Sequence, residues 1–363
     1  MTAAAPGDVL CLADGAYTEA VQPTRSGVAG KPITVRALND GKATIDGQGA
    51  RIPLMLYHDW WAVEGLVLRN GTVATARVEG DNNVLRRVSA HDADTDENSA
   101  VIFIWGDGNL LEDVAAAGSG RYTVEVFEGG GNTLRRVFAM WGAWDGRAFC
   151  GVTWPQGYNI GVYNASNTTV EHAVAYGRAP TAALMVQANS DTKAANNNTV
   201  TGSLALLAGR DYDGSVWAYG TGLAQPVTRP GPTTCGATHV TRWDWGTQRV
   251  GFLLWGQGTL QNNVFRDVIG AWNMGPGFAA VRPYAAGTVA GNRIERGAFF
   301  GNGEGAMSWE GKQLHNGLGV QVTQGAPVRA NLPPVPWPMG ERIRVELGVN
   351  VDAIITQATE GMR

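Results

Sequence analysis

Short segments of alternating apolar and polar residues, separated by turns rich in Asn and Gly, recur along most of the chain. Three successive examples are "ARVEGDNNVLRRVSAHD", "SAVIFIWGDGNLLEDVAAAG" and "YTVEVFEGGGNTLRRVFAMWG". Alternation with a period of two predicts β-strands, and the Asn and Gly residues predict tight turns with left-handed backbone conformations. No segment before about residue 340 has a convincing helical period, so the pattern favours an all-β fold.

An asparagine marks the same point in most of these repeats. Alignment on it gives Asn83, Asn109, Asn132, approximately Thr168, Asn198, Asn263 and Asn292. The steps between them range from 23 to 36 residues, except for one step of 65 residues that we expect to span two turns. A strand that returns at a steady period stacks in parallel on its own earlier copy, so the repeats predict a solenoid. The asparagines are then expected to form one recurring corner, and the arginines of "NNVLRRV" to point outward.

Two N-terminal stretches resemble a known family. They are "PGDVLCLADGAYTEAVQPTRSGVAGKPITVRALNDGKATIDGQG", Pro6 to Gly49, and "WWAVEGLVLRNG", Trp60 to Gly71. Both are similar to the opening turns of right-handed parallel β-helix proteins of the pectin-lyase-like superfamily. The resemblance is closest to the polysaccharide lyases that include chondroitinase B and alginate lyases. It implies a right-handed parallel β-helix and an enzyme that acts on acidic polysaccharides.

We therefore expect one right-handed parallel β-helix over residues 1–330, with ten or more turns and inserted loops. A Pro-rich linker and a C-terminal segment, residues 331–363, are expected to pack on the coil. We place this segment over the end of the coil, because an open end exposes unpaired strand edges.

The family resemblance does not supply the catalytic residues. It implies a lysine base, a nearby arginine, and acidic and amide calcium ligands on a turn past the middle of the coil. The chain has only four lysines, Lys31, Lys42, Lys193 and Lys312. None of them lies in a segment like the catalytic strand of the family, so we transfer no catalytic residue and argue function from local residues.

Two insertions into the repeats carry the richest candidate chemistry, since loops that project from a solenoid often bind ligands. The first begins at Trp141 and the second runs from Arg210 to Arg249. Their Trp rings are suited to stacking on sugars, and their Asp and Arg side chains to binding hydroxyls or carboxylates. The predicted substrate-binding residues of the two loops are Trp141, Trp144, Asp145, Arg210, Trp243, Asp244 and Trp245.

A polysaccharide lyase needs a cation for the uronate carboxylate, a base for the C5 proton and an acid for the leaving oxygen. Arg147, Arg210 or Arg249 are candidates for the cation, and Tyr163 or His172 for the base. A glycosidase would instead need two facing carboxylates from Asp145, Glu171, Asp211, Asp213 and Asp244. The predicted catalytic residues are Arg147, Glu171, Tyr163 and Asp213.

The segment "HDADTDENS" alternates Asp92, Asp94 and Asp96 and resembles the front of a calcium loop. It lacks the glycine at the sixth position and the glutamate at the twelfth that an EF-hand requires. An irregular calcium site or a solvated acidic turn are the two interpretations. Three cysteines without Cys-x-x-Cys spacing indicate neither a disulfide framework nor a zinc site.

Charge and hydropathy narrow the classes of partner. A net charge of −4 offers no basic surface for nucleic acid, and no apolar run is long enough to span a bilayer. Residues 1–20 lack the regions of a signal peptide, so either the chain is cytoplasmic or a leader has been removed. We expect an extracellular or periplasmic protein whose leader is absent from this sequence. The sequence favours a secreted polysaccharide lyase. The alternatives are a non-catalytic glycan-binding, adhesion or surface-structural β-helix, and a glycoside hydrolase.

Overall fold

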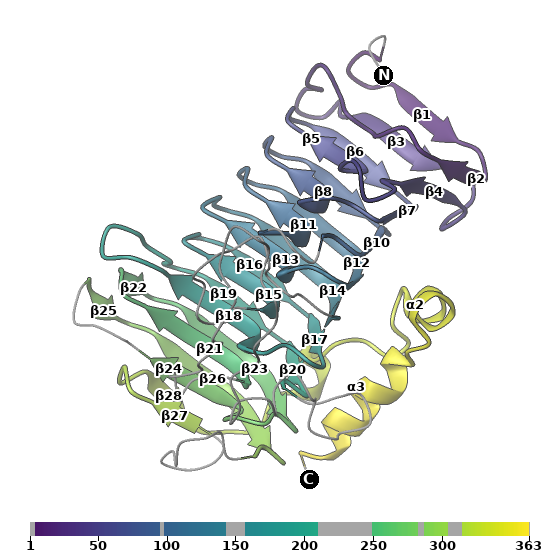
Figure 1. Cartoon of the computed structure of the whole chain (residues 1–363). Coiled ribbons are helices and arrows are strands. Elements are labelled where there is room, and N and C mark those ends of the chain that lie inside the picture. Colours follow the sequence, from purple (N-terminus) through teal and green to yellow (C-terminus); the bar gives the residue numbers. More distant parts are fainter. Residues whose placement is uncertain are drawn as a thin grey trace, which may run out of the picture.

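The chain winds into a long coil of parallel strands, with the N-terminus at one end (Figure 1). This computed structural model describes residues 4–94, 98–142, 157–209, 249–281, 287–303 and 314–362. Each turn of the coil adds strands to up to three parallel sheets, which we number in the order that the chain meets them. The predicted all-β, right-handed parallel β-helix is confirmed.

The first and second sheets meet at a sharp bend within each turn. The first sheet contains β1 (Val9–Leu12), β3 (Ile33–Ala37), β6 (Trp61–Glu64), β9 (Val84–Arg86), β16 (Thr169–Glu171), β19 (Thr199–Thr201) and β28 (Gln321–Thr323). The second contains β2 (Gly15–Tyr17), β4 (Ala43–Asp46), β7 (Leu66–Arg69), β10 (Ser89–His91), β17 (Val174–Tyr176) and β20 (Leu204–Leu206). Four longer strands run through the bend and belong to both sheets: β12 (Leu110–Gly118), β14 (Thr133–Trp141), β23 (Val264–Ala271) and β26 (Arg293–Phe300).

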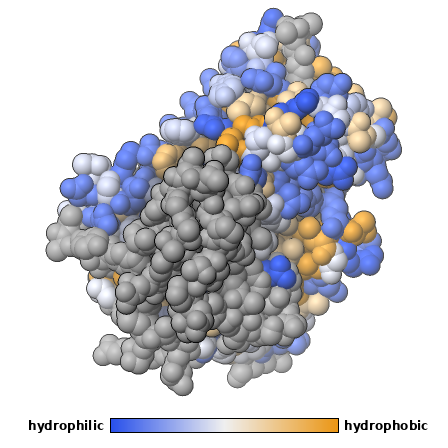
Figure 2. All heavy atoms as spheres, in the orientation of Figure 1, coloured by the Kyte–Doolittle hydropathy of each residue, from blue (hydrophilic) through white to orange (hydrophobic). Residues whose placement is uncertain are grey.

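The third sheet is a nine-stranded parallel sheet that closes each turn. It contains β5 (Leu54–Leu56), β8 (Ala74–Val78), β11 (Ala100–Ile104), β13 (Tyr122–Phe127), β15 (Tyr158–Tyr163), β18 (Ala182–Ala188), β21 (Val250–Gly256), β24 (Phe278–Val281) and β27 (Leu314–Asn316). A short pair, β22 (Leu260–Gln261) and β25 (Val289–Ala290), lies between the third and first sheets. Apolar residues from all three sheets fill the interior of the coil, whereas the surface of the N-terminal turns is mainly hydrophilic (Figure 2).

The recurring asparagines form a buried ladder at the corner before the first sheet. The Asn83 Oδ1 accepts the backbone N–H of Trp61, the Asn109 Oδ1 accepts that of Asn83, and the Asn132 Oδ1 accepts that of Asn109, each at 2.8 Å. Thr168 takes the same corner position, where its N–H donates to the Asn198 Oδ1 at 2.9 Å. The amides thus satisfy backbone groups that the corner would otherwise bury unpaired, and the predicted corner is confirmed.

The step of 65 residues is one turn, which corrects our expectation of two. The Asn198 N–H donates directly to the Asn263 Oδ1 at 3.1 Å, and β19 pairs with β23. The third-sheet strands β18 and β21 also pair residue by residue. The added length is therefore a single insertion between the second and third sheets, and residues 210–248 of it lie outside the described residues.

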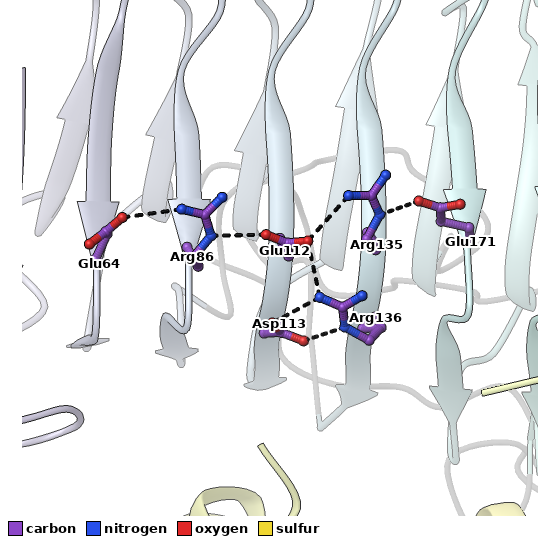
Figure 3. A network of polar contacts seen from close by, with 7 residues as sticks. All are labelled: Glu64, Arg86, Glu112, Asp113, Arg135, Arg136 and Glu171. Carbon is purple, nitrogen blue, oxygen red and sulfur yellow. Dashed lines mark hydrogen bonds and ion pairs between the residues drawn. The ribbon is translucent and has the colours of Figure 1, made fainter. Parts of the chain in front are cut away.

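Outward-facing residues of the first sheet form a ladder of alternating charge (Figure 3). Glu64, Arg86, Glu112, Arg135 and Glu171 occupy matching positions on successive strands. Arg86 contacts Glu64 at 3.3 Å and Glu112 at 2.9 Å, while Arg135 bridges Glu112 and Glu171. Each exposed ion pair contributes little to the stability of the fold. A shift in strand register would place like charges beside each other, so the ladder favours the observed register. The arginines point outward, as the sequence predicted.

The C-terminal segment lies along the outer face of the second sheet rather than over the end of the coil (Figure 1). It contains a 3-10 helix (Arg329–Asn331), α2 (Gly340–Leu347) and α3 (Val351–Glu360). Trp337, Ile343 and Ile355 pack with outward-facing apolar residues of the sheet such as Leu204 and Ile269. This outer face is apolar, and the helices shield it from water instead of covering the end of the coil, which corrects the predicted position.

Asp267 fastens the start of this segment to the coil. Its side chain is buried at the bend between the first and second sheets, where it pairs with Arg296 at 2.7 Å. It also accepts the Val328 N–H at 2.9 Å and the Asn331 Nδ2–H at 2.8 Å. The Arg296 hydrogen bond, aided by these donors, lowers the pKa of Asp267 to about 2.

Asp267→Asn is expected to lower the free energy of unfolding by about 2 kcal/mol at neutral pH, because it leaves Arg296 without its buried partner. The contribution of a carboxylate with a lowered pKa is present above its unfolded value, near 4, and is lost as the pH falls toward about 2. Denaturant unfolding should therefore show a smaller difference between variant and wild type at about pH 2.5 than at neutral pH. Glu341→Gln, which breaks an exposed pair with Arg344, is the control, and an equal effect in both variants would contradict this role.

Candidate functional site

The outer face of the third sheet carries an unusual cluster of ionisable and aromatic side chains. On β13 and β15, alternation directs Val124, Val126, Ile160 and Val162 into the core of the coil. The intervening positions point outward and place Glu125 directly beside Gly161, and Phe127 beside Tyr163. The same period of two that builds the core therefore places Glu125, Phe127 and Tyr163 on the outer face.

Glu125 is a buried carboxyl group on this outer face. Its side chain is 3 % exposed, and the Tyr158 hydroxyl donates to its Oε1 at 2.7 Å. Tyr158 can lie across β15 because position 161 is glycine: a Cβ there would come within 2.0 Å of the Tyr158 ring. Burial raises the pKa of Glu125 to about 7, although Tyr158 and the positive charge of Arg121 act in the opposite direction. This carboxyl group therefore changes its charge near neutral pH.

Tyr163 lies beside this pair and is partly exposed. Its hydroxyl oxygen accepts a hydrogen bond from the Asn189 Nδ2 at 2.7 Å. Burial, and then the negative charge of Glu125, raises the pKa of Tyr163 above its usual value. A tyrosine that keeps its proton is suited to act as an acid. This arrangement argues against the predicted role of Tyr163 as the base.

Aromatic side chains continue from Tyr163 along the coil. Tyr163 stacks on Phe127 with ring centroids 5.3 Å apart, and Phe127 stacks on Phe103 at 5.8 Å. Trp105 stands almost perpendicular to both phenylalanine rings and is 41 % exposed. Rings of this kind are suited to pack against the apolar faces of sugars.

Two arginines lie beside aromatic residues of this face. The Arg121 guanidinium is 4.8 Å from the centroid of the Tyr122 ring and donates to the Asn98 Oδ1 at 2.6 Å. Arg77 lies 5.4 Å from the Phe103 ring. Arg249, which we expected as a candidate cation for the substrate, is buried, and burial lowers its pKa to about 10. Arg121 and Arg77 are therefore better placed on this face to attract an anion.

The structure corrects two of the predicted site residues. Trp141 is fully buried at the end of β14, where its Nε1–H donates to the Gly120 carbonyl at 2.8 Å. Its ring packs within the fold and cannot stack on a sugar. Glu171 is part of the charge ladder of the first sheet, whereas Tyr163 lies on the third sheet. These two predicted catalytic residues therefore do not meet in one site.

The remaining predicted residues of the two loops lie outside the described residues. They are Trp144, Asp145 and Arg147 in the first insertion, and Arg210, Asp213, Trp243, Asp244 and Trp245 in the second. In the sequence, the two insertions immediately precede β15 and β21, which are both strands of the third sheet. Their roles stay predictions.

Sequence reasoning missed Glu125 and Tyr158. The available signal was the strand "YTVEVF", Tyr122 to Phe127, in which a glutamate takes an outward position in an otherwise apolar segment beside Tyr residues. An ionisable group in such surroundings is a candidate for a shifted pKa.

The predicted calcium site is only partly covered by the structure, because Asp96 lies outside the described residues. The Asp92 Oδ1 accepts the backbone N–H of Ser119 at 2.8 Å, so it also has a structural role at its corner. Asp92 and Asp94 line a shallow polar hollow of about 550 Å³. Within the described ranges, no three His, Cys, Asp or Glu side chains are grouped to hold a metal ion. The calcium site stays a prediction.

The buried Glu125 is expected to make folding less favourable as the pH rises from about 5 to about 8. A carboxyl group with a raised pKa stabilises the fold below its unfolded value of 4.5, and this contribution is lost as the pH rises through about 7. The loss approaches roughly 3 kcal/mol. Denaturant unfolding across this range should show a weaker pH dependence for Glu125→Gln than for wild type. Parallel curves would show that Glu125 does not titrate in this way.

Comparisons with known proteins agree with the resemblance of the N-terminal turns. Residues 1–97 match the family model described as Chondroitinase B. The three parallel sheets show a parallel β-helix fold, and this match covers its N-terminal turns. No curated protein has a significant sequence match. In the part of the chain that the structure describes, no helix is long and apolar enough to cross a membrane.

Several solved structures are similar to this chain at low sequence identity. Pectate lyase Pel9A is 16% identical, with 91% of this chain and 72% of that chain covered and a TM-score of 0.46. The A-module of the mannuronan C-5 epimerase AlgE6 from Azotobacter vinelandii is 13% identical, with 88% and 91% covered and a TM-score of 0.44. An alginate lyase from Paenibacillus sp. is 12% identical, with 81% and 94% covered and a TM-score of 0.37.

Proposed function

We propose that the protein binds an acidic polysaccharide on the outer face of the third sheet and cleaves it by β-elimination. The observation that carries this proposal is the neighbouring placement of Glu125, whose pKa is about 7, and Tyr163, whose pKa is raised. Two groups that differ in this way can act as base and acid at the same pH. The match of residues 1–97 to the Chondroitinase B family supports the class of substrate.

In this mechanism, the Glu125 carboxylate takes the C5 proton of a uronate residue. The electron pair forms a C4–C5 double bond while the bond from C4 to the leaving oxygen breaks, and the Tyr163 hydroxyl gives its proton to that oxygen. Glu125 then returns a proton to Tyr163 through water, so both groups regain their starting states. Because Tyr158 occupies the Oε1 of Glu125, the substrate has to reach the other carboxylate oxygen.

Arg121 is proposed to neutralise the uronate carboxylate, which makes the C5 proton more acidic. It directly precedes β13, the strand that carries Glu125. Arg147 and Arg210 remain proposed partners in this role, and the Trp and Asp residues of the two insertions remain proposed contacts to the sugar chain. A protein with this activity is proposed to act outside the cytoplasm.

A second candidate is non-catalytic glycan binding, and the partly exposed aromatic rings favour it. The line from Trp105 to Tyr163 needs no chemistry in order to hold a sugar chain. Hydrolysis is less well supported, because the described carboxylates at the ends of β8 and β13 already have partners. Glu79 and Glu128 there form ion pairs with Arg77 and Lys193, whereas a glycosidase needs a second available carboxylate.

The proposal is tested by incubating the protein with polyuronates and glycosaminoglycans, with and without calcium. Ultraviolet absorbance reports unsaturated uronate, a reducing-end assay reports every cleavage, and a pull-down reports binding. We expect both absorbance and reducing ends to increase. Reducing ends without absorbance would indicate hydrolysis instead, and binding without either signal would indicate a non-catalytic glycan-binding protein.

A further inference from the structure

The aromatic side chains of the third sheet lie in a line along the coil rather than around it. Trp105 directly follows β11, in which Ile104 pairs with Val126 of β13, and Phe127 pairs with Tyr163 of β15. Trp105, Phe127 and Tyr163 therefore take corresponding positions on three successive turns. Adjacent strands are about 4.8 Å apart, a spacing similar to the length of one sugar residue in an extended chain.

We infer that Trp105 forms a second sugar-binding subsite, two turns from Tyr163, so that an acidic polysaccharide lies lengthwise along the third sheet toward the N-terminal end of the coil. This inference rests on the proposed function and adds the direction of the bound chain and the residue that holds it. It also makes affinity depend on chain length, because only a longer chain reaches both Tyr163 and Trp105.

The ring geometry separates supporting side chains from the one that meets the ligand. Phe127 lies between Phe103 and Tyr163 in a stack with interplanar angles of 29° and 27°, so both faces of its ring are occupied. Trp105 meets Phe103 at 83° and Phe127 at 86° and is 41 % exposed. The phenylalanines therefore fix the orientation of Trp105, which offers the exposed surface. A ring that is already held in place loses little conformational entropy on binding.

Hydrogen-bond donors of Arg77 beside Trp105 favour a chain that carries carboxylates over a neutral one. The Arg77 guanidinium lies 5.4 Å from the centroid of the Phe103 ring and 5.8 Å from that of Trp105, and Glu79 holds it through an ion pair. A uronate that packs against Trp105 would place its carboxylate near this cation. The occupant is therefore proposed to be an acidic polysaccharide, the same class that the proposed reaction requires.

The test measures dissociation constants for oligouronates of increasing length, by calorimetry in a Glu125→Gln background that prevents cleavage. We expect affinity to rise with length, and Trp105→Ala to remove this rise, weakening the longest oligomers about tenfold while the shortest are unaffected. Trp105→Phe should restore part of the gain. Leu38→Ala removes an exposed apolar side chain that follows β3 of the first sheet and should change nothing.

The outcomes separate this inference from the proposed function. If wild type cleaves polyuronates but Trp105→Ala keeps the full dependence on length, the lengthwise subsite is wrong and the reaction stands. If wild type neither cleaves nor binds any oligouronate, both proposals fail. Equal affinity for neutral oligosaccharides of the same length would contradict the role assigned to Arg77.

Discussion

Glu125→Gln is expected to lower the rate of eliminative cleavage by about a thousandfold and to leave polysaccharide binding nearly unchanged. Glutamine keeps the shape and the hydrogen-bonding oxygen of the side chain, so Tyr158 retains an acceptor, but the amide cannot take the C5 proton. The measurement is the initial rate of ultraviolet absorbance increase, together with the dissociation constant of an oligouronate. Glu295→Gln makes the same substitution on the outward row of the first sheet and should keep full activity.

The pH dependence of the cleavage rate also tests the role of Glu125 as the base. In wild type, the rate should rise with pH through about 7, where the carboxyl group of Glu125 loses its proton. The Tyr158 hydrogen bond lowers the pKa of Glu125, so Tyr158→Phe should move this rise to higher pH. Full activity of Glu125→Gln, or an unmoved pH profile in Tyr158→Phe, would place the base elsewhere.

Asn263→Ala is expected to lower the free energy of unfolding by about 3 kcal/mol or more, because several buried groups lose their partners together. Its Oδ1 accepts the backbone N–H of Asn198 at 3.1 Å, and its Nδ2 donates to the Ala195 carbonyl at 2.8 Å and the Asn292 Oδ1 at 2.9 Å. All of these contacts lie inside the corner between the third and first sheets, where water cannot replace them.

Denaturant unfolding measures this effect, with Asn39→Ala as the control. Asn39 is an exposed turn residue whose Nδ2 contacts Asp14 at 3.1 Å, so we expect a change within about 0.5 kcal/mol there. If Asn263→Ala lowers the free energy of unfolding by less than about 1 kcal/mol, the asparagine ladder does not stabilise the coil in the way proposed.

The repeated parts of the fold could be predicted from the sequence because every turn has to satisfy the same buried backbone groups at the same corner. Backbone N–H and C=O groups are buried at the same corner of each turn, and a buried asparagine side chain can hydrogen-bond to them. Residues such as Asn83 and Asn263 therefore recur in the sequence at a detectable period. Insertion lengths follow no such rule. The sequence therefore predicts two turns for the 65-residue step, whereas strand pairing shows that it is one turn.

The position of the C-terminal helices and the residues of the site could not be predicted, because both depend on contacts between segments that are far apart in the sequence. The apolar outer face of the second sheet, with Leu204 and Ile269, can be recognised only once the strands are stacked. Trp141 stands at the start of an insertion but is buried in the fold. Glu125 and Tyr158 are 33 residues apart and meet only because β13 and β15 are neighbours. Local sequence pattern carries no direct record of such contacts.

A crystal structure of Glu125→Gln with a bound acidic oligosaccharide would test most directly whether the outer face of the third sheet is the substrate-binding face of the protein. We expect a sugar residue against the Tyr163 hydroxyl and the amide nitrogen of the glutamine at position 125, which takes the place of the second carboxylate oxygen, with the chain continuing along the coil to Trp105. An oligosaccharide bound on the first or second sheet instead would contradict this expectation.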